Sequence, residues 1–168
     1  MEMHMWILFC IFAMTYITDT TAVQEYENVA LRGVATQASL YGHATAPRAI
    51  DGNRESNFHL GSCSSTDSVL SPWWRLDLLQ KYIIQTVSIT NRGDDAPERI
   101  NGAEIRFGSN LGNNGNSNAR CAVINSIPAG ATSSFNCSGW MGRYVNVVIP
   151  GRVEYLTLCE VEVYGSPV

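Results

Sequence analysis

The sequence predicts an all-β domain, an antiparallel β-sandwich or jelly roll. Two observations support this prediction. The chain beyond residue 22 has no long helical stripe but several short runs rich in β-branched and aromatic residues. Clusters of Gly, Asn, Ser and Pro separate these runs. Short strands joined by such turn clusters are typical of sandwiches and jelly rolls.

The expected strands follow one another along the second half of the chain. In the last of them, Val161 and Val163 alternate with Glu160 and Glu162, so one face carries apolar and the other polar side chains. With no internal repeat and no linker, the pattern indicates one domain. The expected strands are residues 73–79, 86–90, 103–108, 143–149 and 156–165.

The first 22 residues have the pattern of a secretory signal peptide. An apolar run is followed by polar residues and by a small residue, Ala22, at the expected cleavage site. The apolar run is short for a membrane span. We therefore predict a signal peptide at residues 1–22, a domain at residues 23–168, and a secreted, extracellular protein.

Charge and cysteine content exclude several classes of function. Loss of residues 1–22 removes two acids and no base, so the net charge changes from −4 to −2 and favours neither nucleic acid nor an anionic membrane. Four cysteines remain after Cys10 is removed, which suggests two disulfides in an exported protein, with three connectivities open. No serine lies in a nucleophile elbow and no carboxylate pair is singled out, so we expect no enzyme.

Asn91–Ile100 follows an expected strand and has three interpretations. Arg92-Gly93-Asp94 matches an adhesion tripeptide. The acidic residues of this stretch suggest a metal-binding loop. Arg92 and Arg99 carry planar groups of hydrogen-bond donors that suit the acceptors of a sugar. The residues alone favour a solvated loop with weak ion pairs.

Two further stretches carry side chains of interest. Arg48–Phe58 alternates oxygen-bearing residues through a Gly-containing turn, which fits either a Ca²⁺ site or an Asx turn without metal. Trp73 and Trp74 suit stacking on a sugar or a base, but neighbours in a strand face opposite ways, so at most one of them is expected in the core.

Taken together, eight segments resemble the F-type lectins, a fucose-binding family. The likeness runs in order from about Glu27 to Tyr164. The segments are "ENVALRGVATQAS", "AIDGNRESNF", "GSC", "PWWRLDL", "ITNRGD", "ERINGAEIRFG", "GRYVNV" and "LCEVEVYG".

The resemblance implies a discoidin-like β-sandwich jelly roll, the F-type lectin fold. It also implies the disulfides Cys63–Cys159 and Cys121–Cys137, and a structural Ca²⁺ ion. The implied metal ligands are the carbonyls of Arg48, Asn53 and Cys159, the side chains of Asp51 and Glu160, and Ser62.

The family's sugar motif is a His, 26 residues, R-x-D, four residues, then Arg or Lys. Arg92, Asp94 and Arg99 match it, whereas Ser65 stands where the His belongs. Where eel lectins of the family have two adjacent, bonded cysteines, this chain has Asp95 and Ala96. Either His59 or His43 is a candidate for the missing imidazole.

The resemblance therefore implies a secreted, calcium-stabilised lectin for terminal L-fucose or related sugars, with a role in innate immunity. Its expected partners are fucosylated glycans or glycoproteins, including microbial surface glycans, and a homo-oligomer would give multivalent binding. The alternative is a discoidin-like adhesion or matrix protein whose changed pocket binds protein or a non-fucose glycan. The expected sugar-site residues are Arg92, Arg99, Asp94, Ser65, Asp95 and Ala96.

Overall fold

The computed structural model describes residues 26–168. Short 3-10 helices precede or connect the strands: η1 (Val29–Arg32), η2 (Ala46–Ile50), η3 (Phe58–Leu60), η4 (Pro97–Ile100) and η5 (Gly112–Gly115). The strands are β1 (Val34–Gln37), β2 (Ser64–Ser65), β3 (Val69–Leu70), β4 (Trp73–Thr90), β5 (Glu104–Gly108), β6 (Ala119–Val123), β7 (Thr132–Val148), β8 (Val153–Glu154), β9 (Thr157–Leu158) and β10 (Glu160–Pro167).

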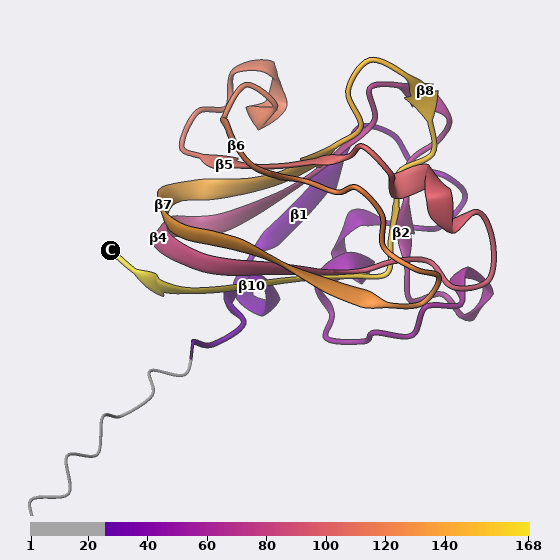
Figure 1. Cartoon of the computed structure of the whole chain (residues 1–168), viewed down its shortest axis with the longest axis horizontal. Helices are drawn as coiled ribbons and strands as arrows, with labels where there is room; N and C mark the ends of the chain where they lie inside the picture. Colours follow the sequence, from indigo (N-terminus) through magenta and orange to yellow (C-terminus); the bar gives the residue numbers. More distant parts are fainter. Residues whose placement is uncertain (1–25) are drawn as a thin grey trace, which may run out of the picture.

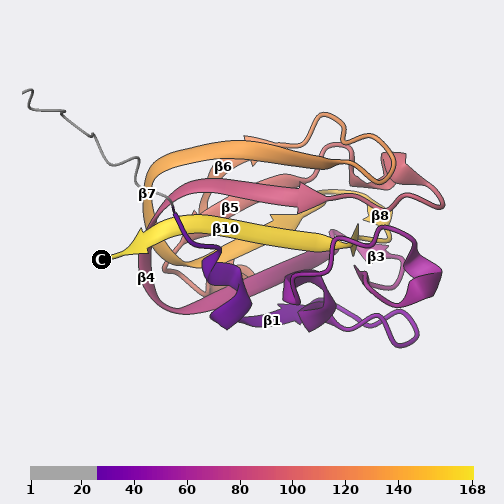
Figure 2. The ribbon, with the colours of Figure 1, turned by 90° about the horizontal axis from the view of Figure 1, so that it is seen from below.

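The long strands β4 and β7 run through both layers of an antiparallel sandwich (Figures 1 and 2). Residues 73–77 of β4 lie between β1 and β7 in one layer, which β5 and β6 extend. Residues 82–90 lie between β10 and β7 in the other layer. The register breaks between Asp77 and Tyr82, where Leu79 takes a positive φ of 67°, so the sheet folds over at this point. The predicted all-β sandwich is confirmed.

The sequence pattern divided β4 differently from the structure. Residues 73–79 and 86–90 are expected as separate strands, but they form one strand of 18 residues. The intervening residues, 80–85, belong to the fold-over between the layers, and they include the exposed Ile83 and the buried Ile84. A bend of this kind mixes the exposure of neighbouring residues, so a strict alternation is not visible there.

The core lies between the layers, as the alternation predicts, and it also includes side chains from the helices. Val161 and Val163 are fully buried in it. Glu160 and Glu162, on the other face of the same strand, are buried as well. The segment after η2 covers this face: the Gly52 N–H donates to Glu160 Oε1 (3.1 Å), and Arg54 pairs with Glu162.

Two disulfides stabilise the loops and the edge of the sheet. Cys63–Cys159 joins residues that are 96 positions apart, and it connects the segment before β2 to the start of β10. Cys121–Cys137 joins β6 to β7. The pairing implied by the family resemblance is confirmed.

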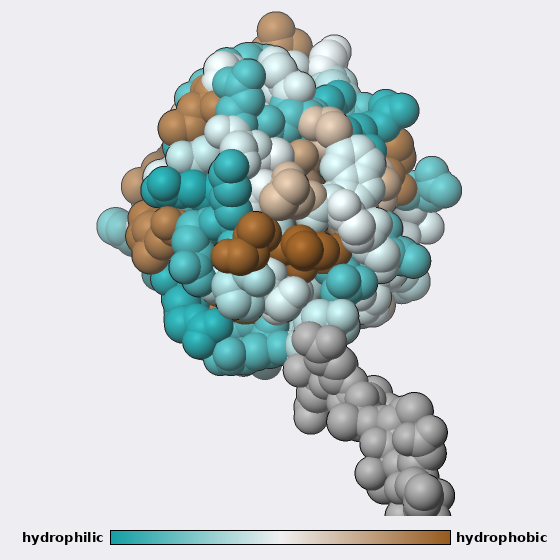
Figure 3. Space-filling model, turned by 90° about the vertical axis from the view of Figure 1, so that its left-hand side faces the viewer, coloured by the Kyte–Doolittle hydropathy of each residue, from teal (hydrophilic) through white to brown (hydrophobic). Residues whose placement is uncertain are grey.

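The end of the molecule near the fold-over carries exposed apolar side chains (Figure 3). Ile83 and Met141 lie opposite each other across β4 and β7, and both are exposed. Within residues 26–168, no helix is long and apolar enough to cross a membrane. The predicted signal peptide at residues 1–22 lies outside the described residues.

Candidate functional site

A pocket of about 290 Å³ lies among the loops at the end of the molecule away from the fold-over. It brings together Ser65, Arg92, Asp95 and Arg99, four of the six residues expected at the sugar site. Tyr41, Phe58, His59 and Tyr155 complete its lining. These residues come from five separate parts of the chain, which the fold assembles at one place.

The loop after β4 is held in place at its base by Asn91. This side chain is buried, and its amide donates to the carbonyls of Pro97 (2.9 Å) and Ile127 (2.8 Å). Gly93 follows, and a Cβ there would lie 2.6 Å from the Ser56 hydroxyl oxygen, so only glycine fits without a shift of its neighbour. The loop then turns into η4 through Ala96, which has a positive φ of 45°.

Asp94 does not line the pocket but orients one of its walls. Its carboxylate accepts from Arg92 Nε (3.0 Å) and Nη2 (2.6 Å), and also from the Phe58 N–H (2.8 Å). The Arg92 guanidinium lies over the Phe58 ring, 4.6 Å from its centroid. Hydrogen bonds from Arg92 hold the pKa of Asp94 down at about 2, so this carboxyl is ionised at neutral pH.

This geometry argues against the adhesion interpretation of Arg92-Gly93-Asp94. The two charged groups bind each other, and their side chains are only 12% and 16% exposed. An adhesion motif needs both groups available to a partner. The remaining Arg92 N–H groups, those that do not face Asp94, are the donors left for a ligand.

Arg99 forms the second arginine of the pocket. Its guanidinium lies over the Tyr155 ring, 5.0 Å from the centroid, and its Nε is 3.6 Å from Glu154 Oε1. Stacking on an aromatic face restricts where the terminal N–H groups point. Arg92 and Arg99 thus each rest on an aromatic ring and line the same cavity.

The aromatic wall is the part of the pocket that the sequence motif does not reveal. Tyr41 contacts Tyr155 edge-on, with centroids 5.4 Å apart, and approaches Phe58 at 6.1 Å. Tyr41 comes from the loop after β1 and Tyr155 from the segment after β8, so no local spacing connects them. The signal that the sequence offered was the presence of aromatic residues outside the expected strands.

His59 takes part in the pocket, and His43 does not. The His59 side chain is 78% exposed, and its Nε2 lies 3.7 Å from Asp94 Oδ2. Ser65, in the position of the family's His, is buried, and its hydroxyl is bonded within the fold to the Thr66 carbonyl (3.1 Å) and to Thr157 Oγ1 (3.0 Å). Ala96 is absent from the lining, so a binding role for Ala96 stays a prediction.

The charges around the pocket nearly cancel. Two arginines face three carboxylates, those of Asp94, Asp95 and Glu154. Asp95 is 63% exposed and lies 4.0 Å from Arg92 Nη2. A strong anion would gain little from such a site, whereas neutral hydroxyl groups find both donors and acceptors in it.

Some of the predicted metal ligands lie at a second place, where the turn at residues 51–53 meets the start of β10. The Gly52 N–H bonded to Glu160 Oε1 holds the two segments together, and the Cys63–Cys159 disulfide brings Ser62 near the same region. The Ser62 hydroxyl donates to the Glu55 carbonyl. Residues 26–168 contain no cluster of three or more His, Cys, Asp or Glu suited to a metal, so an ion here would depend on backbone carbonyls such as those of Arg48 and Asn53.

The state of Glu160 fits a cation. This residue has no exposed surface, and its Oε2 has no hydrogen-bond partner within residues 26–168. Burial raises the pKa of its carboxyl to about 7, and the nearby Asp51 carboxylate acts in the same direction. A buried carboxylate with one unpaired oxygen is costly, and a divalent ion with oxygen ligands would offset this cost.

Comparisons with known proteins agree on the family. Residues 48–147 match the model of a NedA-like, galactose-binding domain family. Fucolectin-4 of Anguilla japonica is 56% identical over 143 residues, which are 82% of this chain and 79% of that protein. The F-lectin (fucolectin) from the serum of Morone saxatilis is 59% identical with a TM-score of 0.83, and the match covers 84% of this chain and 48% of that one.

A more distant structure shares the fold with a ligand in place. The lectin domain of Lectinolysin complexed with Lewis b antigen is 27% identical with a TM-score of 0.72, covering 84% of this chain and 99% of that one. Lectins bind carbohydrate and do not catalyse a reaction. By its identity to the fucolectins over most of its length, this chain belongs to the F-type lectin (fucolectin) family and is a lectin rather than an enzyme.

Proposed function

We propose that this protein is a secreted, calcium-stabilised lectin that binds terminal L-fucose or a related sugar in the pocket of Arg92 and Arg99. The observation that carries the proposal is the pair of arginines, each stacked on an aromatic ring and both lining one cavity. Relatives named fucolectins, at 50–56% identity, support the same ligand.

In this proposal, the arginines donate to the ring oxygen and hydroxyls of the sugar. Asp94 binds two N–H groups of Arg92 and so presents the others to the ligand. Arg99 is 32% exposed, which leaves its terminal N–H groups accessible from the pocket. Hydrogen bonds from a charged donor contribute about 1.5–3 kcal/mol each, so two such residues account for most of the polar recognition.

The walls suit a 6-deoxy sugar. Where other family members place an apolar disulfide, this chain has Asp95 and Ala96, but Tyr41, Phe58 and Tyr155 supply an apolar surface in the same pocket. A 6-deoxy sugar carries a methyl group that gains from such a surface, and a fully hydroxylated hexose lacks this group. The nearly balanced charge also favours a neutral ligand.

His59 is the residue that we assign to the role of the family's missing histidine. The Ser65 hydroxyl already makes hydrogen bonds to Thr66 and Thr157, so it is poorly placed to bond a sugar. His59 borders the same cavity with an exposed imidazole close to Asp94. The imidazole thus reaches the sugar from η3 rather than from the β2 position.

The remaining parts of the proposal rest on other features. The buried, unpartnered Glu160 oxygen supports the Ca²⁺ ion, and the apolar run at the start of the sequence supports secretion. The serum origin of the Morone saxatilis relative supports an extracellular place. A part in innate recognition of microbial glycans belongs to the same proposal. A single shallow sugar pocket binds weakly, so a homo-oligomer would raise avidity.

The test is glycan-array binding by the Arg99→Ala variant, with free fucose as competitor. We expect the variant to lose the fucosylated signals while its melting temperature stays close to that of the wild type. Arg32→Ala is the matched control, because Arg32 is a surface arginine that pairs with Glu27 and does not line the pocket. Undiminished, fucose-sensitive binding by Arg99→Ala would refute the site.

The alternative is an adhesion or matrix protein on the same scaffold, which binds protein or a non-fucose glycan. The exposed Asp95 carboxylate at the pocket favours it, since it adds negative charge beside Arg92. The same array separates the two: binding that free fucose does not compete, and that Asp95→Ala abolishes, supports the alternative.

A further inference from the structure

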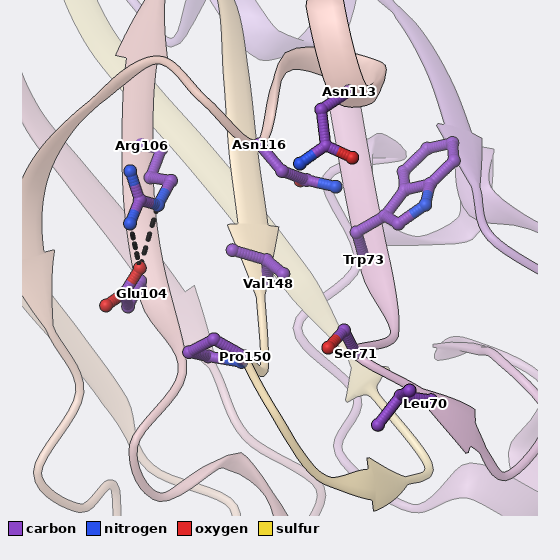
Figure 4. Close-up of a pocket in the computed structure, with 9 residues that line it drawn as sticks. All are labelled: Leu70, Ser71, Trp73, Glu104, Arg106, Asn113, Asn116, Val148 and Pro150. Carbon is purple, nitrogen blue, oxygen red and sulfur yellow. Dashed lines mark hydrogen bonds and ion pairs between the residues drawn. The ribbon is translucent and has the colours of Figure 1, made fainter.

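A second cleft, of about 370 Å³, lies on the outer face of the layer formed by β4, β7 and β5 (Figure 4). Val148 of β7 forms its floor, and Trp73 of β4 lies on one side with Glu104 and Arg106 of β5 on the other. The η5 loop contributes Asn113 and Asn116. None of these residues belongs to the lining of the arginine pocket.

The charged groups of the cleft are satisfied by one another. Glu104 accepts from Arg106 Nε (2.7 Å) and from Arg120 Nη1 (2.7 Å), so both of its oxygens are occupied. Arg106 also donates from Nη1 to the Asn118 carbonyl (2.8 Å). A metal would find no free carboxylate oxygen and an anion no free guanidinium, so the cleft is suited to a neutral ligand.

The groups that remain for a ligand are neutral donors and acceptors. Within residues 26–168, the side-chain amide of Asn113 makes no hydrogen bond, and Asn116 uses only its oxygen, which accepts from Asn146 Nδ2 (3.0 Å). The Ser71 hydroxyl accepts from the Gly151 N–H (2.9 Å) and keeps its own proton to donate. Such amides and hydroxyls match the hydroxyl groups of a sugar.

Trp73 adds an aromatic surface to these polar groups. The Arg75 guanidinium packs over its ring at 5.4 Å from the centroid, which holds the indole in place. Trp74, its neighbour, is buried in the core, so the strand gives one tryptophan to the core and one to the cleft. The apolar C–H face of a pyranose ring packs well on such a surface.

Hydrogen bonds to the sheet fix the η5 loop above the cleft. The Asn114 carbonyl accepts from Arg75 Nη1 (3.1 Å) and from Asn146 Nδ2 (2.9 Å), and Asn146 is fully buried. These bonds connect the η5 loop to β4, at one side of the cleft, and to β7, at its floor. A ligand would therefore lose little affinity to ordering the loop.

We propose that this cleft is a second carbohydrate-binding site, which takes a neutral pyranose by packing it on Trp73 and bonding its hydroxyls to Asn113, Asn116 and Ser71. The β3–β8 ribbon lies between the two sites: Leu70 of β3 lines the cleft, whereas Tyr155, directly after β8, lines the arginine pocket. The site does not depend on fucose binding in the pocket. Two sites per chain would let one molecule engage two branches of a glycan.

The test is an NMR titration of the purified protein with methyl β-D-galactopyranoside, a neutral pyranoside with a continuous C–H face. The reporter is the Trp73 indole N–H signal, identified by its loss in Trp73→Phe. We expect a saturable shift with a dissociation constant in the millimolar range, both in the wild type and in the pocket variant Arg99→Ala. We expect Asn113→Ala to weaken this binding about fivefold, the value of one hydrogen bond.

The controls keep the two proposals separate. Asn125→Ala removes another exposed asparagine outside the cleft and should leave the titration unchanged. If the wild type binds no fucoside but still gives the Trp73 response, the pocket proposal alone is defeated. No Trp73 shift, a shift that disappears in Arg99→Ala, or equal affinity in Asn113→Ala overturns the second site.

Discussion

Replacing Asp94 with Asn tests whether one carboxylate holds Arg92 and Phe58 together in one wall of the arginine pocket. Asp94 accepts two hydrogen bonds from Arg92 and one from the Phe58 N–H, and its side chain is 16% exposed. Asparagine keeps the size but removes the charge and one acceptor. The Arg92 guanidinium then loses its bidentate partner and is free to leave the Phe58 ring.

The structure sets the magnitude of this effect. The pKa of Asp94 lies at about 2, against an ordinary value of 3.8. A shift of this size corresponds to about 2 kcal/mol of unfolding free energy, and partial exposure reduces it to about 1–2 kcal/mol. For a domain of this length, the melting temperature of Asp94→Asn should fall by roughly 3–8 °C.

The pH dependence gives the sharper measurement. Because the pKa is lowered in the folded state, the Asp94 contribution is fully present above about pH 4 and is lost as the pH falls through about 2. Urea unfolding should therefore separate wild type from Asp94→Asn at pH 6 and show the difference shrinking toward pH 2. Asp67→Asn, at an exposed position, is the control. Equal stability at pH 6, or a difference that does not change with pH, would refute the reasoning.

Three other predictions concern the metal, the imidazole and the edge disulfide. Chelation should lower the melting temperature, since an ion at one hundred times its Kd stabilises the folded state by about 2.7 kcal/mol. Glu160→Gln should abolish this response. A metal analysis that finds no calcium would defeat the calcium prediction. His59→Ala should weaken glycan binding about fivefold without changing the melting temperature, because the side chain is 78% exposed; unchanged affinity would remove His59 from the site. The double variant Cys121→Ser/Cys137→Ser, which opens a loop of 16 residues, should lose about 3 kcal/mol in urea unfolding, and no loss would show that the disulfide does not stabilise the fold.

Much of the fold follows from local patterns. Alternation in residues 160–163 correctly predicts which valines enter the core, because side chains in a strand point to opposite faces in turn. The same rule predicts that Trp73 and Trp74 point to opposite faces of the strand. It fails for Glu160 and Glu162, since the segment that covers their face comes from residues about 108 positions earlier. Burial by a distant loop leaves no mark on the strand's own pattern.

The candidate site was predicted in part. Arg92, Arg99 and Ser65 were expected from the spacing of the family's motif and Asp95 from the position of a family cysteine, and all four line the pocket. Tyr41 and Tyr155 were not, because each belongs to a loop whose neighbours in sequence carry no sugar-binding pattern. The choice of His59 over His43 also depended on where η3 is placed by the Asp94–Phe58 hydrogen bond.

By itself, the sequence determined the fold class, because strand periodicity and turn composition are local properties of the chain, and its resemblance to the F-type lectins indicated the family and the two arginines. The tertiary structure decided which aromatic rings support those arginines, that Asp94 faces Arg92 rather than solvent, and that Trp73 opens onto a separate cleft. These features arise from contacts between segments far apart in the chain, where packing of the two layers rather than local preference fixes each side chain.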